Sequence, residues 1–130
     1  MLNIKKISTL LIAGIGICLT GCYKDRTVIQ DTAPEITRTV TFSNDILKIF
    51  NTSCNGSGCH ARGGQVPDLS ASDAFNSLTI GNYINKTAPT QSVIYLKMSG
   101  KRGAVMPVTG LNKDYNALML AWIKQGAKNN

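Results

Sequence analysis

The chain has 130 residues, of which 14 are Lys or Arg and seven are Asp or Glu, so its formal net charge is +7 at pH 7. This length suits one domain at most. The positive charge is not arranged in basic runs with interleaved aromatic side chains, so the composition gives no support to nucleic-acid binding.

Residues 1–21 predict an export signal. Lys5 and Lys6 form a positive start, and residues 7–19 are almost wholly apolar, which is too short for a membrane span of about 20 residues. The sequence Leu-Thr-Gly-Cys at residues 19–22 resembles the bacterial lipobox, which implies cleavage before Cys22 and lipidation of that cysteine. We therefore expect a protein of the cell envelope, anchored by lipid to a membrane on the periplasmic or outer-membrane side.

Residues 22–40 are mostly polar and lack apolar periodicity, so we expect a tether that joins the lipid to a folded domain at residues 41–130. Loss of Lys5 and Lys6 with the signal lowers the formal charge from +7 to +5. With only three Phe, four Tyr and one Trp in the whole chain, the domain has few large apolar side chains for a core.

The first predicted helix covers residues 42–50. Ser43 is its expected N-cap, Asp45 suits the positive end of the helix dipole, and the helix should loosen at residues 51–53. One face carries apolar residues at helical spacing, namely Ile46, Ile49 and Phe50.

The sequence Cys54-Asn-Gly-Ser-Gly-Cys59-His60 follows directly, and His60 is the only histidine of the chain. Two cysteines closed by Cys-His are the signature of covalent haem attachment, usually with two intervening residues. The thiols join the haem vinyl groups, and the next imidazole reaches the iron. Here the spacer has four residues, and its turn-forming composition lets the extra residues bulge outward while both thiols face inward.

Other chemistries remain open for these residues. In an oxidising compartment, Cys54 and Cys59 could form a disulfide in a haem-free lipoprotein. A zinc site would need four protein ligands, mostly Cys or His, and the mature chain would offer three apart from Cys22.

Two short helices are expected next, at residues 72–78 with Ser72 as a possible cap and at residues 91–98. The clearest helix begins after Asn112 and ends at Gly126, which suits a helix C-terminus. Its apolar stripe comprises Leu111, Tyr115, Leu118, Met119, Trp122 and Ile123. No strand alternation stands out, so the sequence predicts an all-α fold of short helices and long loops.

Three methionines of the mature chain could supply a sulfur ligand to a haem iron. Met119 lies on the apolar stripe and is better explained as core, and Met98 ends a short helix and could be core too. Met106 lies in a non-helical segment, and Pro107 disfavours helix for its backbone, so the thioether can project. We favour Met106, and a distal side without a ligand is its main rival.

With these features, residues 40–127 resemble small bacterial class I cytochromes c, here a lipid-anchored form with a C-x4-C-H attachment variant. The resemblance also covers Pro67-Asp68-Leu69, Met106-Pro107 and the final helix. It implies a cytochrome c-like fold around one covalent haem c, with Cys54 and Cys59 in thioethers. It further implies His60 and Met106 as the two iron ligands. It also implies that the first and last helices cross, packing Phe42, Ile46 and Phe50 against Tyr115, Leu118 and Trp122.

The expected function is single-electron transfer between redox partner proteins of the envelope. A Met ligand raises the potential of haem iron, a six-coordinate iron leaves no open position for substrate, and the sole histidine is committed, so we do not expect an enzyme. A five-coordinate haem that senses a small ligand is the further alternative. The charges at Lys97, Lys101 and Arg102 are interpreted as a solvated face. Spacing does not choose among three polar-tipped aromatic residues that could bond haem propionates, which are Tyr83, Tyr95 and Trp122.

Overall fold

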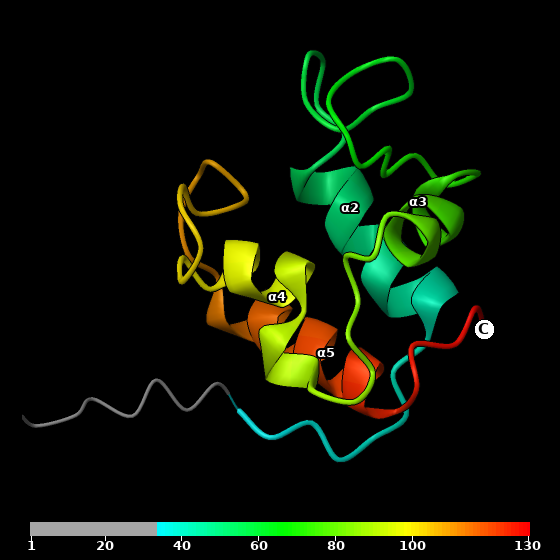
Figure 1. Ribbon diagram of the computed structural model, residues 1–130, viewed down its shortest axis with the longest axis vertical. Helices are drawn as coiled ribbons and strands as arrows, with labels where there is room; N and C mark the ends of the chain where they lie inside the picture. Colours follow the sequence, from blue (N-terminus) through cyan, green and yellow to red (C-terminus); the bar gives the residue numbers. More distant parts are fainter. Residues whose placement is uncertain (1–33) are drawn as a thin grey trace, which may run out of the picture. The chain divides into compact units, whose positions relative to one another are not determined.

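The structure is a computed structural model that describes residues 34–130. The predicted signal at residues 1–21, the lipidation site Cys22 and most of the tether lie outside the described residues. Within the described part the chain is helical and has no strand, which confirms the all-α prediction (Figure 1). The helical segments are η1 (Phe42–Ile46, a π-helix), α2 (Leu47–Ser53), α3 (Ala74–Ile80), η2 (Pro89–Gln91, a 3₁₀ turn), α4 (Val93–Met98) and α5 (Lys113–Lys124).

The first helix begins at Phe42, and its N-cap is Thr41, two residues before the Ser43 that the sequence suggested. Thr41 has extended backbone angles, and its hydroxyl accepts a hydrogen bond from the Asn44 N–H at 3.3 Å, so Thr41 is the N-cap. The prediction of Ser43 was wrong because Ser43 is already helical and donates its N–H to the backbone oxygen of Asn130 at 2.9 Å. The helix also stays regular through Ser53 instead of loosening at residues 51–53.

The two middle helices lie close to their predicted positions, with shifted starts. The helix predicted at residues 72–78 is α3, and Ser72 does not cap it because its hydroxyl is bonded to the carboxylate of Asp73. The helix predicted at residues 91–98 ends at Met98 as expected, but extended backbone at Ser92 separates α4 from η2.

Helix α5 confirms both of its predicted boundaries. The side chain of Asn112 accepts a hydrogen bond from the Tyr115 N–H at 3.0 Å, and Gly126 follows the helix with a φ of +99°. The N–H groups of Gly126 and Ala127 bond the carbonyls of Ile123 and Trp122, which is the Schellman pattern. Its apolar stripe is confirmed except at Leu111, which precedes the helix and is 43% exposed.

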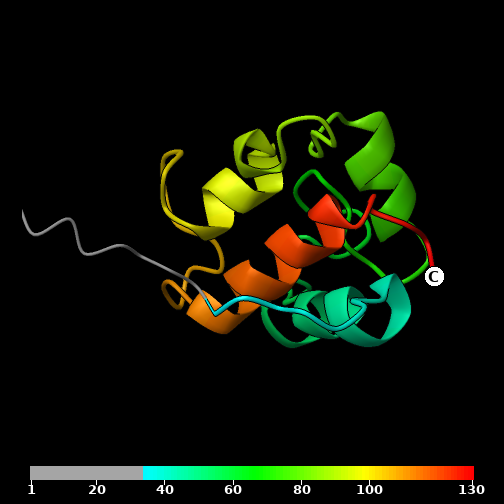
Figure 2. The same cartoon turned by 90° about the horizontal axis from the view of Figure 1, so that it is seen from below.

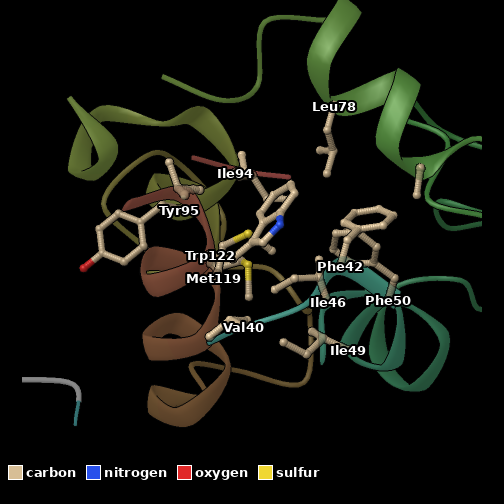
Figure 3. Packing of buried hydrophobic residues seen from close by; sticks show 14 of the residues in the cluster. Val40, Phe42, Ile46, Ile49, Phe50, Leu78, Ile94, Tyr95, Met119 and Trp122 are labelled. Atoms are coloured by element: carbon tan, nitrogen blue, oxygen red, sulfur yellow. The ribbon is translucent and has the colours of Figure 1, made fainter. Parts of the chain in front are cut away.

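The core forms where α5 lies between α4 and the η1–α2 helix (Figure 2). Phe42 packs against Trp122 with ring centroids 5.3 Å apart, and the ring of Phe75 from α3 also contacts Phe42, at 5.3 Å. Ile46, Phe50, Met119 and Trp122 are all essentially inaccessible to solvent (Figure 3). The expected packing of the first helix on the last is therefore confirmed at its centre.

Residues 34–40 run beside α5 and are tied to it. The Val40 N–H donates to Oε1 of Gln125 at 2.8 Å, and Nε2 of Gln125 donates to the Arg38 carbonyl at 3.0 Å. Val40 is buried in the core, and Ile36 packs against it. The folded part thus begins several residues before residue 41. None of the helices between residues 34 and 130 is long and apolar enough to cross a membrane.

Candidate functional site

The predicted site residues surround two adjoining cavities of about 220 Å³ and about 70 Å³. The larger one lies among the end of α2, the helix α4, and the loops that follow these helices, which Figure 1 shows extending beyond the helix ends. Both cavities are lined by the same four residues, Cys54, His60, Gln65 and Met106, and Cys59 joins the lining of the smaller one. The four residues predicted from the sequence, which are Cys54, Cys59, His60 and Met106, therefore lie around the same pair of cavities.

The cysteine spacer folds as a compact turn at the C-terminal end of α2. The Cys54 N–H donates to the Phe50 carbonyl at 2.8 Å, which holds this cysteine on the helix end. The Cys59 N–H then donates to the Gly56 carbonyl at 2.9 Å, and residues 56–58 are exposed. The expected outward bulge is confirmed, and it leaves both cysteines on the cavity side.

The imidazole of His60 is held in one tautomer by two carbonyl groups. Its Nδ1 lies 3.0 Å from the Pro67 oxygen and 3.2 Å from the Gln65 oxygen. Carbonyl oxygens only accept hydrogen bonds, so Nδ1 is the donor, and in the neutral ring the lone pair then lies on Nε2. An imidazole fixed in this way is prepared to ligate a metal through Nε2.

Both cysteines are free thiols in the structure. Burial, with a further contribution from Cys59 nearby, raises the pKa of Cys54 to about 11. Cys54 is therefore protonated and uncharged near neutral pH, which is consistent with its position against apolar side chains.

The three methionines differ in their burial and in the cavities that they line. Met119 is fully buried in the core and lines neither cavity, as expected for core. Met98 is 4% exposed and lines only the larger cavity, whereas Met106 lines both. The Met106 N–H donates to the Lys97 carbonyl at 3.0 Å, which anchors its loop to the end of α4.

The lining of the larger cavity is mainly apolar. Its other members are Phe50, Val66, Pro67, Leu69, Tyr83, Val93, Ile94, Lys97 and Met98. Of the three aromatic residues with polar tips, only Tyr83 lines the cavity, because Trp122 donates its indole N–H to the Lys128 carbonyl and Tyr95 packs in the core. The site thus combines soft sulfur groups and one imidazole with an apolar hollow.

A zinc site finds no support in the geometry. In residues 34–130, no three side chains of His, Cys, Asp or Glu lie close enough together to hold a metal ion. The single imidazole therefore has no set of ionic ligands beside it.

Sequence reasoning missed Gln65, which lines both cavities and whose carbonyl contacts the His60 ring. It named Pro67 but not its bond to His60. No sequence signal marks Gln65, because it is a polar residue in a glycine-containing loop. A backbone carbonyl is one of the groups that commonly accept a hydrogen bond from the ring N–H of a ligating histidine, and any residue can supply it.

Comparison with protein-family models, curated proteins and solved structures found no match to this chain.

Proposed function

We propose that the protein is a monohaem c-type cytochrome of the cell envelope that carries single electrons. The observation that supports this most strongly is the meeting of two thiols, an imidazole bonded through Nδ1 and a thioether around two adjoining apolar cavities. These groups are what covalent haem attachment and His/Met ligation require. On this proposal the fold is of the cytochrome c type.

Each residue has a definite part in the proposal. The thiols of Cys54 and Cys59 would each add across a vinyl group: the S–H bond and the C=C π bond break, a C–S and a C–H bond form, and no oxidant is needed. His60 would ligate iron through Nε2 while its Nδ1–H stays hydrogen-bonded to the carbonyl of Pro67. Met106 would supply the second ligand. The haem would provide a reversible one-electron couple between ferric and ferrous iron.

Electron transfer to a partner requires the site to approach the surface. Val66 and Val108 border the larger and the smaller cavity, and they are 81% and 78% exposed. These uncovered apolar side chains give the site an accessible edge at which a redox partner protein could dock. With His60 and Met106 both ligating it, the iron would have no open position for a substrate, so we propose a carrier and not an enzyme.

An optical spectrum of the membrane fraction, with mass spectrometry of the denatured protein, tests the proposal. We expect a reduced low-spin haem spectrum and a chain mass increased by one haem. A high-spin spectrum that changes with carbon monoxide would favour the five-coordinate sensor. A chain without haem whose thiols are joined would establish the disulfide lipoprotein. The same fractions test the lipid anchor. Cys22→Ala should leave a soluble or unprocessed precursor, so the membrane fraction should no longer contain mature protein with haem.

A further inference from the structure

The four-residue spacer is held locally by two main-chain hydrogen bonds, from the Cys59 N–H to the Gly56 carbonyl at 2.9 Å and from the His60 N–H to the Cys54 carbonyl at 3.1 Å. Helix α2 ends at Ser53, and residues 56–58 are exposed. Cys59 and His60 must nevertheless keep fixed positions beside the cavities if a thiol and an imidazole are to act on one group. Neither local bond involves a side chain of the exposed residues 56–58, so a further tie to these residues has to come from another part of the chain.

Gln65 contacts all three parts of this segment. Its N–H donates to the Cys59 carbonyl at 2.7 Å, and its carbonyl accepts from the His60 ring at 3.2 Å. Its side chain reaches back to the spacer, where Nε2 lies 3.4 Å from the Gly58 carbonyl. This side-chain bond is long, but it is a direct tie between Gln65 and the spacer itself.

Gly64 allows this close approach. A Cβ atom at Gly64 would overlap the carbonyl oxygen of Cys59 and come within 3.0 Å of that of Ala61. The Gly64 N–H donates to the same Ala61 carbonyl at 2.8 Å, which closes a turn over Cys59. Only glycine fits at this point of the turn, so the loop is shaped to hold Gln65 against the attachment segment.

We propose that Gln65 is a positioning residue that compensates for the long spacer, holding Gly58 through its side chain so that the Cys59 thiol meets its haem vinyl group. The inference rests on the proposed function. The main-chain bonds of Gln65 to Cys59 and His60 place the carboxamide, and the carboxamide restrains the spacer. Cys54 needs no such help because α2 holds it.

The test is Gln65→Glu, which keeps the size of the side chain but removes the donor to the Gly58 carbonyl. Peptide mapping by mass spectrometry measures the fraction of chains with haem on each cysteine. We expect a selective loss at Cys59 with attachment at Cys54 retained. A second background, in which Gly56 and Ser57 are deleted to give the usual two-residue spacer, should abolish the effect of Gln65→Glu.

Gln91→Glu is the matched control, because Gln91 is exposed on η2 and lines neither cavity. If Gln65→Glu attaches haem as Gln91→Glu does, the inference is overturned. It is equally overturned by an equal loss at both cysteines that persists with the short spacer, since that would indicate a general loss of folding. A parent chain with no covalent haem would instead overturn the proposed function and, with it, this inference.

Discussion

The helical core and the cavity region are built in different ways. In the core, aromatic side chains from η1, α3 and α5 pack directly on one another, and Phe50, Ile46 and Trp122 have almost no exposed surface. Around the cavities, loops are held mainly by backbone hydrogen bonds, such as those of Gln65 to Cys59 and Met106 to Lys97. Val66 and Val108 remain exposed there.

The core therefore supplies most of the stability, and the cavity region carries the reactive side chains. Burial of apolar side chains supplies most of the free energy of folding. Among residues 34–130, most of the buried core residues line neither cavity, and the two regions share only Phe50, Leu69, Ile94 and Met98. The cavity region keeps its reactive groups on chain that contributes less to packing. Substitutions in the two regions should therefore affect different observables.

The largest expected effect on stability is that of Trp122→Ala. The change removes the partner of Phe42 and leaves the Lys128 carbonyl without its indole donor, so we expect a loss of about 3–5 kcal/mol in the free energy of unfolding. Denaturant unfolding measures it. Leu111→Ala, at a position 43% exposed, should cost far less. Equal losses for the two variants would contradict the assignment of the core.

A pair of methionine variants compares the two regions directly. Met119→Ala should cost about 2–5 kcal/mol of stability and leave the haem spectrum unchanged, because Met119 is fully buried and lines neither cavity. If the proposed function holds, Met106→Ala should leave stability nearly unchanged, turn low-spin iron high-spin and lower the reduction potential, because the proposed ligand favours ferrous iron. Unfolding curves and redox titrations measure the two effects.

Met98 is the critical comparison for that ligand, since it also lines the larger cavity. Met98→Ala should lower stability without changing the spin state. If Met98→Ala abolishes the low-spin spectrum and Met106→Ala preserves it, the ligand is Met98, although the haem proposal stands.

The smallest effect concerns the start of the first helix. Hydrogen bonds from Arg38 hold the pKa of Asp45 below its ordinary value of 3.8, and the Thr41 N–H adds to this. A lowered folded-state pKa stabilises the protein above the unfolded-state pKa, and this contribution is lost as pH falls through the folded-state value. Asp45→Asn should therefore lower stability slightly at neutral pH, and the difference from the parent should shrink below about pH 4. Thermal unfolding across pH measures it, and a constant difference would contradict the ion pair.

The elements that sequence predicted well are those set by neighbouring residues. Asn112 and Gly126 bound α5 through hydrogen bonds within that helix and its ends. The turn between Cys54 and Cys59 was predictable because its Gly, Ser and Asn residues are local too, and residues 56–58 are exposed as expected. In both cases a short stretch of chain contains the whole reason for its structure.

The predictions failed where contacts with residues far away in the sequence determine the local structure. Ser43 and Thr41 are both good caps by residue type, and the choice depends on Asn130, which bonds the Ser43 N–H from the other end of the domain. Gln65 was missed for the same reason, since its contacts to the spacer and to His60 exist only once the loop has folded back.

The attachment of residues 34–40 to Gln125 also determines how the domain bears mechanical load. The two hydrogen bonds of Gln125 join positions 85 and 87 residues apart, so tension applied to the chain before Pro34 passes directly into the end of α5. From there it reaches the packed rings of Trp122 and Phe42. Neither Gln125 nor any residue of 34–40 lines the two cavities, so a pull at this end loads the core before it reaches the cavity lining.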